Sequence, residues 1–279
     1  LWQGWIAAEA LERIRLHVRP YEKRPGETER VFGEGIDAIA GAVSSPNGRP
    51  GLWNHAILSA FRESAAALKD VAVDRSRVRP LIGIVGEFYT VLNRWANQDL
   101  VKTIERLGGE VVLHGLTVPN FYALFSGHYY PRSRLKQGRI GAAAYYWLRN
   151  HWMMGWIKEV EKSLPAALRP LGTMGAGKIV QESDPFIYHD IDPVLATFTA
   201  RVRQFADLGI SGICNLFVLN CMLGNITVPI FKRALAEYPG LPVLHAVYDG
   251  QGGTNMLTRI EAFMHQATRH HKYSQQKHF

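Results

Sequence analysis

Apolar residues near the amino terminus recur at the spacing of a helix. The pattern predicts an amphipathic helix at the start of the chain and consists of Trp5, Ala8, Leu11 and Ile14. Two prolines and a glycine in "RPYEKRPGETER", residues 19–30, interrupt this pattern and predict an ordered loop. Helical patterns return over residues 31–43 and 54–69. Between them "SSPNGRPG", residues 44–51, is typical of a linker.

From residue 80 the pattern changes to short, continuous apolar runs. "LIGIVG" at 81–86 and "EVVLHG" at 110–115 predict two strands that are buried on both faces. The first is followed by a predicted loop, "GEFYTVLNRWANQ", and by a helix within "NQDLVKTIERLGG". Asn97 is the expected cap of this helix and Gly108 its expected end. Strand, helix and strand form a βαβ unit, which predicts parallel pairing.

The second half of the chain repeats the alternation of helix and strand. Two more strands are predicted at 212–219 and 242–248. Pro229 is expected at the beginning of one helix, and Thr258 and Glu261 have the spacing of a capping box for the last one. The predicted helices cover residues 194–208, about 228–237, and 259 onward.

These patterns predict the α/β fold class, with a doubly wound, mostly parallel sheet of about four strands and helices on both faces. The α/β domain is expected to cover residues 49–279. Residues 1–48 are expected to be a helical segment that continues from an upstream domain, because the chain starts at Leu1 and enters a helical pattern at once. With 279 residues, of which 47% are hydrophobic, the chain is long enough for a substantial core.

The charge of the chain points to an anionic partner. A net charge of +8 and a pI near 9.5 suit a phosphorylated cofactor, a nucleic acid or an acidic protein. The basic residues are scattered, without a block of five like charges, which argues against nucleic acid. No apolar run reaches the roughly 18 residues of a membrane span, and no signal peptide opens the chain. The expected location is therefore the cytoplasm, with no membrane partner.

The two cysteines, Cys214 and Cys221, have different predicted positions. A strand rises about 3.3 Å per residue, so the two lie on the order of 20 Å apart and cannot form a disulfide. Cys214 is inside the predicted strand, where a small buried thiol is expected. Cys221 follows the carboxyl end of that strand, the edge at which open α/β sheets bind ligands. It is either a structural residue or a thiolate suited to iron binding or nucleophilic attack.

Polar residues follow two other predicted strands at the same edge. Glu87 and Asn93 precede a helix, an arrangement that binds polar or anionic groups of a ligand. Alternatively, they hydrogen-bond the loop backbone, while Asn97 only caps the helix. Asp249 and Gly250 end the last strand, where the carboxylate either satisfies turn amides or faces the site. The candidate substrate-binding residues are thus Glu87, Asn93, Asp249 and Gly250.

Other motifs carry less information. "GTMGAGK", residues 172–178, has the spacing of a phosphate-binding P-loop, but Ile179 replaces the magnesium-binding Ser or Thr and the preceding "SLPAALRPL" does not read as a strand. We therefore predict that this segment does not bind ATP. The aromatic residues of 140–168 are expected to form core or an interdomain face rather than to stack on bases. The histidines lack zinc-site spacing.

Several segments together resemble a known family. They are "RPLIGIVGEFYTVLNRWANQDLVKTIERLGGEVVLHG", "GICNLFVLNCMLGN" and "LPVLHAVYDGQGGTNMLTRIEAFMHQA". In this order and spacing they resemble D-component-like subunits of the 2-hydroxyacyl-CoA dehydratase and benzoyl-CoA reductase family. The opening "LWQGWIAAEALERI" and the following "RPYEKRPGETERVF" look more specifically like the C-terminal part of acyl-CoA dehydratase activase-related proteins.

The resemblance implies an iron–sulfur cofactor. Members of the family are oxygen-sensitive proteins of anaerobes in which an ATP-hydrolysing activator delivers a low-potential electron to a cluster, and substrates are coenzyme A thioesters. Cys221 matches a metal-ligand position, but the family's Cys-Met-Pro is Cys-Met-Leu here, and Asn220 precedes the cysteine. A 4Fe–4S cubane takes four thiolates. Its other ligands are therefore expected from upstream sequence, a partner or a non-cysteine residue.

Two functions follow from this resemblance. The first is a C-terminal module of an activase-related iron–sulfur protein that supports ATP-driven, low-potential electron transfer in (2-hydroxy)acyl-CoA dehydration or reduction. ATP would bind only in the upstream domain, and the expected partners are an acyl-CoA substrate or dehydratase or reductase subunits, with an oligomer left open. The alternative is a non-catalytic interaction or scaffolding module of the same fold without a cluster.

Overall fold

The computed structural model describes residues 1–45, 53–113, 124–249 and 255–276, and divides the chain into two compact units. Unit 1 consists of Leu1–Arg77 and Gly115–Gly177, and unit 2 of Val78–His114 and Lys178–Phe279. The predicted linker at 44–51 and the predicted domain boundary between residues 48 and 49 fall almost entirely on residues 46–52, outside the described residues.

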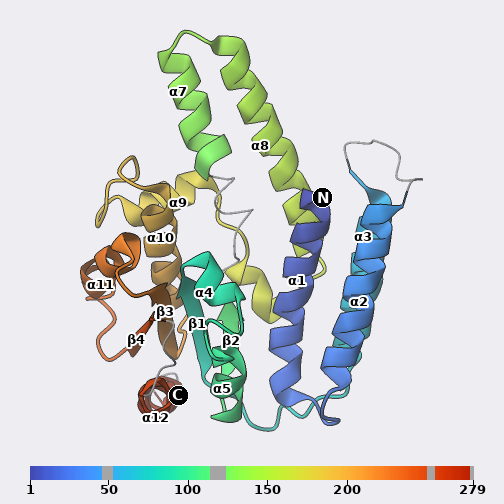
Figure 1. Ribbon diagram of the computed structural model, residues 1–279, viewed down its shortest axis with the longest axis vertical. Coiled ribbons are helices and arrows are strands. Elements are labelled where there is room, and N and C mark those ends of the chain that lie inside the picture. The colour runs from blue at the N-terminus through green and yellow to red at the C-terminus, as the bar shows by residue number, and fades with distance from the viewer. Residues whose placement is uncertain (46–52, 114–123, 250–254, 277–279) are drawn as a thin grey trace. The chain divides into compact units, whose positions relative to one another are not determined.

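Unit 1 is built from helices (Figure 1). Their bounds are α1 Trp2–Val18, η1 Arg19–Tyr21, α2 Glu27–Ser44, α3 His55–Lys69, η2 Phe125–Tyr129, α7 Tyr130–Lys136, α8 Ile140–Glu161 and η3 Ala166–Leu171. Asn54 caps α3 by accepting hydrogen bonds from the backbone N–H groups of Ala56 and Ile57. The helices predicted from 31–43 and 54–69 are thus confirmed, the first with a longer span.

The core of unit 1 contains the inner face of α1. Ala7, Leu11 and Ile14 are fully buried, at i, i+4 and i+7 of this helix. Trp5 was expected on the same face, but 55% of its surface is exposed. The reason is geometric, because positions spaced by three residues drift around a helix that has 3.6 residues per turn. At the start of the helix, Trp2 instead contributes an aromatic ring to the packing against α8.

Unit 2 contains the predicted parallel sheet. Its strands are β1 Leu81–Gly86, β2 Glu110–Leu113, β3 Gly212–Val218 and β4 Val243–Tyr248, in the order β2-β1-β3-β4. All three pairings are parallel, with Ile84 opposite both Leu113 and Cys214, and Cys214 opposite Leu244. The four apolar runs identified in the sequence are therefore the strands of one sheet, as predicted.

Helices cover both faces of this sheet (Figure 1). On one face Gly83 lies against the ring of Phe205 in α10, and on the other face Gly212 lies against the ring of Phe263 in α12. The helices of unit 2 are α4 Phe88–Leu92, α5 Leu100–Arg106, α9 Ala176–Ser183, α10 Pro193–Asp207, α11 Met222–Ala234 and α12 Met256–Gln276, with α9 beginning at the end of unit 1. The doubly wound α/β class is confirmed.

Three local predictions in unit 2 were wrong. The segment after β1 was expected to be a loop, but it contains α4, which Glu87 caps. The helix expected near 228–237 begins at Met222, and Pro229 lies inside it, because the chain turns directly from β3 into α11. The last helix begins at Met256, so Thr258 is inside the helix and is not its cap.

The segment with P-loop spacing has no strand before it. Residues 166–171 form the 3₁₀ helix η3, so the expectation that this segment is not a strand is confirmed. Lys178 forms an ion pair with Glu182 at 2.5 Å within α9. None of the described helices combines the length and apolar character needed to cross a bilayer.

Candidate functional site

The carboxyl edge of the sheet in unit 2 collects the residues that the sequence singled out. Glu87 directly follows β1, Cys221 comes three residues after the end of β3, and Asp249 directly follows β4. Because β1, β3 and β4 are adjacent and parallel, their carboxyl ends meet at the same edge. The predicted placement of these three residues at one edge is confirmed. Gly250 lies outside the described residues.

A tight turn after β3 places Cys221 at the start of α11. Asn220 has a φ of 63°, in the left-handed region, and the Cys221 N–H donates to the carbonyl of Val218 at 3.0 Å. The Cys221 sulfur accepts a hydrogen bond from the Gly224 N–H at 3.4 Å and so caps the helix. Gly224 is required here, because a Cβ would lie 2.3 Å from the ring of Phe217. Cys221 is half-buried.

Cys214 has a different environment. It is fully buried in β3, and burial raises the pKa of its thiol above the ordinary value. A thiol in such a position stays protonated and is a poor metal ligand or nucleophile. Both cysteines are free thiols, and the expectation that Cys214 is a packing residue is confirmed.

A buried polar network lies between β3, β4 and α11. The Asn215 amide donates to the Thr227 hydroxyl at 2.7 Å and lies 3.1 Å from His245 Nδ1. The Thr227 hydroxyl in turn donates to the carbonyl of Gly224 at 2.5 Å, next to the Cys221 turn. Burial lowers the pKa of His245, and the nearby Arg259 lowers it further. Sequence reasoning missed this network because His245 is isolated along the chain.

Glu87 and Asn93 both hydrogen-bond their own loop. The Glu87 carboxylate accepts from the Tyr89 N–H, the Thr90 N–H and the Thr90 hydroxyl, at 2.7–2.8 Å. Partial burial raises the pKa of Glu87, but these hydrogen bonds outweigh it and hold the pKa below the ordinary value. Asn93 Oδ1 accepts from the backbone N–H groups of the second and third residues after it. The contacts of the loop-stabilising alternative are thus present, and ligand binding by these residues stays a prediction.

Asn97 bonds both to the loop and to the first residue of α5, although it does not directly precede the helix. Its amide nitrogen donates to the carbonyls of Thr90 and Val91, and its oxygen accepts from the N–H of Leu100. The residue directly before α5 is Asp99, whose side chain does not cap the helix. Asn97 is almost completely buried, so its role is to tie α4 to α5.

The chain does not contain a complete cluster site. The sequence has two cysteines, and only Cys221, which is half-buried, lies at the edge. A cubane cluster requires about four thiolates. Cys221 offers one free thiol at this edge, so a cluster here would take its other ligands from upstream sequence, a partner or a non-cysteine residue.

Comparisons with known proteins leave the family unassigned. No family model, curated protein or solved structure matches this chain. The likeness to the dehydratase family thus rests on the motifs quoted above.

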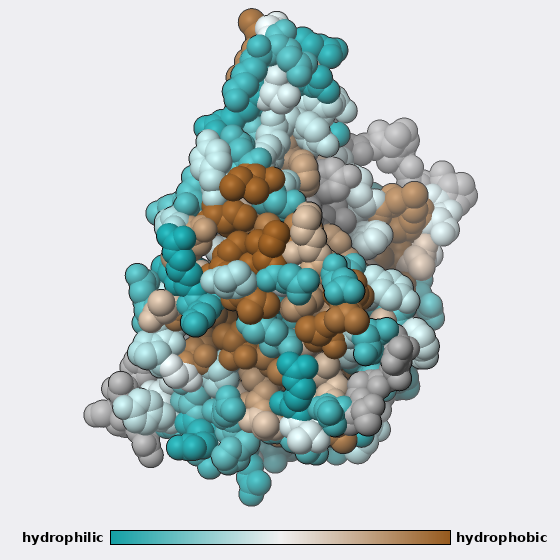
Figure 2. All heavy atoms as spheres, turned by 60° about the vertical axis from the view of Figure 1, so that its left-hand side comes forward, coloured by the Kyte–Doolittle hydropathy of each residue, from teal (hydrophilic) through white to brown (hydrophobic). Residues whose placement is uncertain are grey.

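Large hydrophobic side chains surround this edge. After β1, Tyr89, Leu92 and Trp95 are more than half exposed, and Trp95 reaches 80%. After β3, Leu219 and Met222 are 56% and 69% exposed. Residues 88, 89 and 92–95 line an open depression of about 660 Å³. Figure 2 shows hydrophobic surface on the side of the molecule that carries α10 and α11. Exposed apolar area of this kind is typical of binding surfaces.

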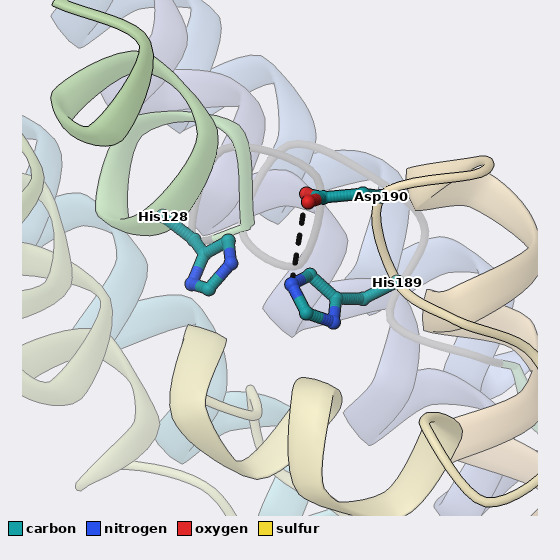
Figure 3. Close-up of side chains that lie close together, drawn as sticks. All are labelled: His128, His189 and Asp190. Carbon is teal, nitrogen blue, oxygen red and sulfur yellow. Dashed lines mark ion pairs between the residues drawn. The ribbon is translucent and has the colours of Figure 1, made fainter. Parts of the chain in front are cut away.

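His189 is held by carboxylates in unit 2. Its Nδ1 lies 2.6 Å from Asp184 Oδ1, which also accepts from the His189 backbone N–H at 3.0 Å. Its Nε2 lies 3.6 Å from Asp190 Oδ1, the pair marked in Figure 3. Figure 3 also labels His128, which belongs to unit 1. These contacts fix the turn that precedes α10, and sequence reasoning, which treated His189 as isolated, did not anticipate them.

Proposed function

We propose that the chain is the C-terminal module of an activase-related iron–sulfur protein, which supports ATP-driven, low-potential electron transfer in (2-hydroxy)acyl-CoA dehydration or reduction. The observation that carries the proposal is the position of Cys221, whose sulfur accepts the Gly224 N–H at the carboxyl edge of the sheet. The chemistry itself comes from the resemblance to the dehydratase family. Cys214, sealed in the core, serves as an internal contrast.

The local structure suits Cys221 for a thiolate role. A backbone N–H directed at the sulfur and the positive end of the α11 dipole both stabilise negative charge. Cys221 would supply one ligand, and the remaining ligands would come from upstream sequence, a partner or a non-cysteine residue. The ATP site would lie in the upstream domain. Glu87, Asn93, Asp249 and Gly250 remain the proposed contacts for the polar part of an acyl-CoA substrate, with dehydratase or reductase subunits as partners.

A second candidate is an interaction module of the same fold without a cluster. It is favoured by two observations at the same edge, which are the lack of a second accessible cysteine and the exposed side chains of Tyr89, Trp95 and Met222. Aromatic residues and methionine are enriched at protein interfaces. In this case the edge would bind a dehydratase or reductase subunit through apolar contacts alone.

Iron content separates the two candidates. The full-length protein is purified and reconstituted without oxygen, and iron, sulfide and visible absorbance are measured for the wild type, Cys221→Ser and Cys214→Ala. We expect Cys221→Ser to lower all three and Cys214→Ala, the matched control, to leave them intact while costing about 1 kcal/mol of stability. Equal cluster loading in Cys221→Ser and the wild type would remove the ligand role and leave the interaction module.

A further inference from the structure

Unit 1 contains a helical hairpin whose outer half is not covered by the described residues of that unit. α7 and α8 lie side by side, joined by a short turn at residues 137–139 (Figure 1). Five large apolar side chains of this outer half are between 54% and 72% exposed: Leu135, Ile140, Tyr145, Trp147 and Leu148. The inner half of α8 is different, since Trp156, Ile157 and Val160 are buried. Core packing therefore accounts for one half of α8 and leaves the other unexplained.

The same segment is strongly basic. No Asp or Glu occurs between Glu110 and Glu159, and the hairpin before the buried half of α8 carries five cationic residues: Arg132, Arg134, Lys136, Arg139 and Arg149. The Arg149 guanidinium lies over the rings of Tyr145 and Tyr146, 5.9 and 5.1 Å from their centroids. A second copy of this surface would be repelled by like charge. The partner that complements it is anionic.

The end of the hairpin distinguishes between anionic partners. Leu135 and Ile140 flank the turn, and Arg134, Lys136 and Arg139 lie beside them. The top of Figure 2 shows hydrophobic and hydrophilic residues side by side at this tip. Exposed aliphatic side chains gain nothing from the phosphates of a nucleic acid. An anionic lipid surface interacts favourably with both kinds of residue, because aliphatic side chains enter the acyl boundary and cationic side chains contact the headgroups.

The spacing of the aromatic residues fits the same partner. A helix rises about 1.5 Å per residue, so Tyr145 and Trp147 lie roughly 7.5 and 10.5 Å along α8 from Ile140. Interfacial helices bury their apolar residues about 5 to 10 Å into a bilayer. With Ile140 at the acyl boundary, these two aromatic residues would lie at the level of the headgroups, where Trp and Tyr are enriched.

We propose that the tip of the α7–α8 hairpin binds an anionic lipid surface. The contact is peripheral, since Leu135 and Ile140 reach only the acyl boundary. The proposal departs from the sequence-based expectation of no membrane partner, which rested on the lack of a spanning segment. It does not depend on the proposed function of unit 2.

Vesicle binding by the full chain tests the proposal. Sedimentation is compared for phosphatidylcholine vesicles with and without roughly 30 mol % phosphatidylserine, at roughly 0.1 M salt. We expect binding to the anionic vesicles that is at least about tenfold tighter, with a blue shift of tryptophan emission. Trp147→Phe should remove most of that shift while the protein still binds, which would place this residue at the interface.

Paired variants identify the surface. We expect the double variants Leu135→Ser/Ile140→Ser and Arg134→Glu/Arg139→Glu each to weaken binding about tenfold or more. Leu257→Ser and Lys232→Glu, exposed positions of the same kinds in unit 2, are the controls and should bind like the wild type. Circular dichroism verifies that each variant is folded. If Leu135→Ser/Ile140→Ser does not fold, the single variant Ile140→Ser replaces it.

Three results would overturn the proposal. One is equal or negligible binding to the two kinds of vesicle. Another is wild-type binding by both double variants. In the third, the wild-type chain does not bind vesicles but binds single-stranded RNA or polyglutamate, and Arg134→Glu/Arg139→Glu abolishes that binding. This result would assign the hairpin to a nucleic acid or an acidic protein.

Discussion

At the scale of single residues, the carboxyl edge depends on close backbone contacts. Gly86 ends β1 with a φ of 137°, and a Cβ at this position would lie 2.0 Å from the carbonyl oxygen of Leu216. The same carbonyl accepts the N–H of Glu87 at 2.8 Å. Only glycine permits both the conformation and the approach. The first residue of the candidate site is thus positioned by a neighbour that has no side chain.

His245 gives this region a dependence on pH. Its folded pKa lies below the ordinary value of 6.5, so the unfolded chain takes up a proton at a higher pH than the folded chain does. The stability that neutral His245 contributes is therefore fully present above about pH 6.5 and is lost as the pH falls through the folded pKa. Burial lowers the pKa of His270 and His271 in the same direction. We expect the free energy of unfolding, measured with urea, to decrease from pH 7 towards pH 5.

The contribution of His245 is separable from that of the other histidines. In His245→Gln the amide oxygen can still accept from Asn215, while the titrating group is gone, so the decrease should become shallower. His265→Gln, at an exposed position of α12, is the matched control. A slope that is the same in His245→Gln and the wild type would contradict the assignment.

The positions of some site residues could be predicted from the sequence, and those of others could not. Glu87 and Cys221 were placed at the edge because each lies shortly after the carboxyl end of a recognisable strand. The hydrogen bonds of Asn93 to its own loop were anticipated as one of two alternatives, since asparagine side chains commonly bond nearby backbone. Asn97 was expected only to cap the helix, so its bonds to the carbonyls of Thr90 and Val91 were not anticipated. The network of Asn215, Thr227 and His245 was not anticipated, because it joins residues up to 30 positions apart and depends on strand pairing.

At the scale of elements, strands were easier to predict than the starts of helices. Each strand is a continuous apolar run, and this pattern records burial on both faces of the sheet directly. Helix starts depend on competition between local signals. Pro229 suggested a beginning, yet α11 runs through it, because the proline costs one backbone hydrogen bond while Thr227 and Phe231 are buried on either side.

The two halves of α8 should respond differently to mutation. Trp156 is fully buried, with the rings of Trp2 and Trp53 at 6.4 and 6.1 Å between centroids. We expect Trp156→Ala to reduce the free energy of unfolding by about 3–5 kcal/mol. Trp147→Ala, on the exposed half of the same helix, should change it by less than about 0.5 kcal/mol. Urea unfolding of the full chain measures both, and similar losses would contradict the division of α8.

At the scale of the whole molecule, the path of the chain explains why the units could not be predicted. Unit 1 is formed by Leu1–Arg77 and Gly115–Gly177, so the first βαβ unit of the sheet lies between its two pieces in the sequence. Composition and turn signals mark boundaries along the chain only. They do not show that Gly115–Gly177 joins the same unit as Leu1–Arg77, because this depends on tertiary packing.

At the scale of the whole molecule, the net charge of +8 attracts anionic nucleotides independently of residues 172–178. A basic protein attracts ATP at low salt, whereas a P-loop binds it specifically. Here the segment follows a 3₁₀ helix, Lys178 is paired with Glu182, and the next residue, Ile179, is buried and has no hydroxyl for magnesium. In calorimetric titration with magnesium ATP, we expect any binding to disappear between roughly 0.02 and 0.15 M salt. Lys178→Ala should behave like Lys232→Ala, a matched loss of one exposed charge, and saturable binding at the higher salt that only Lys178→Ala abolishes would show a working P-loop.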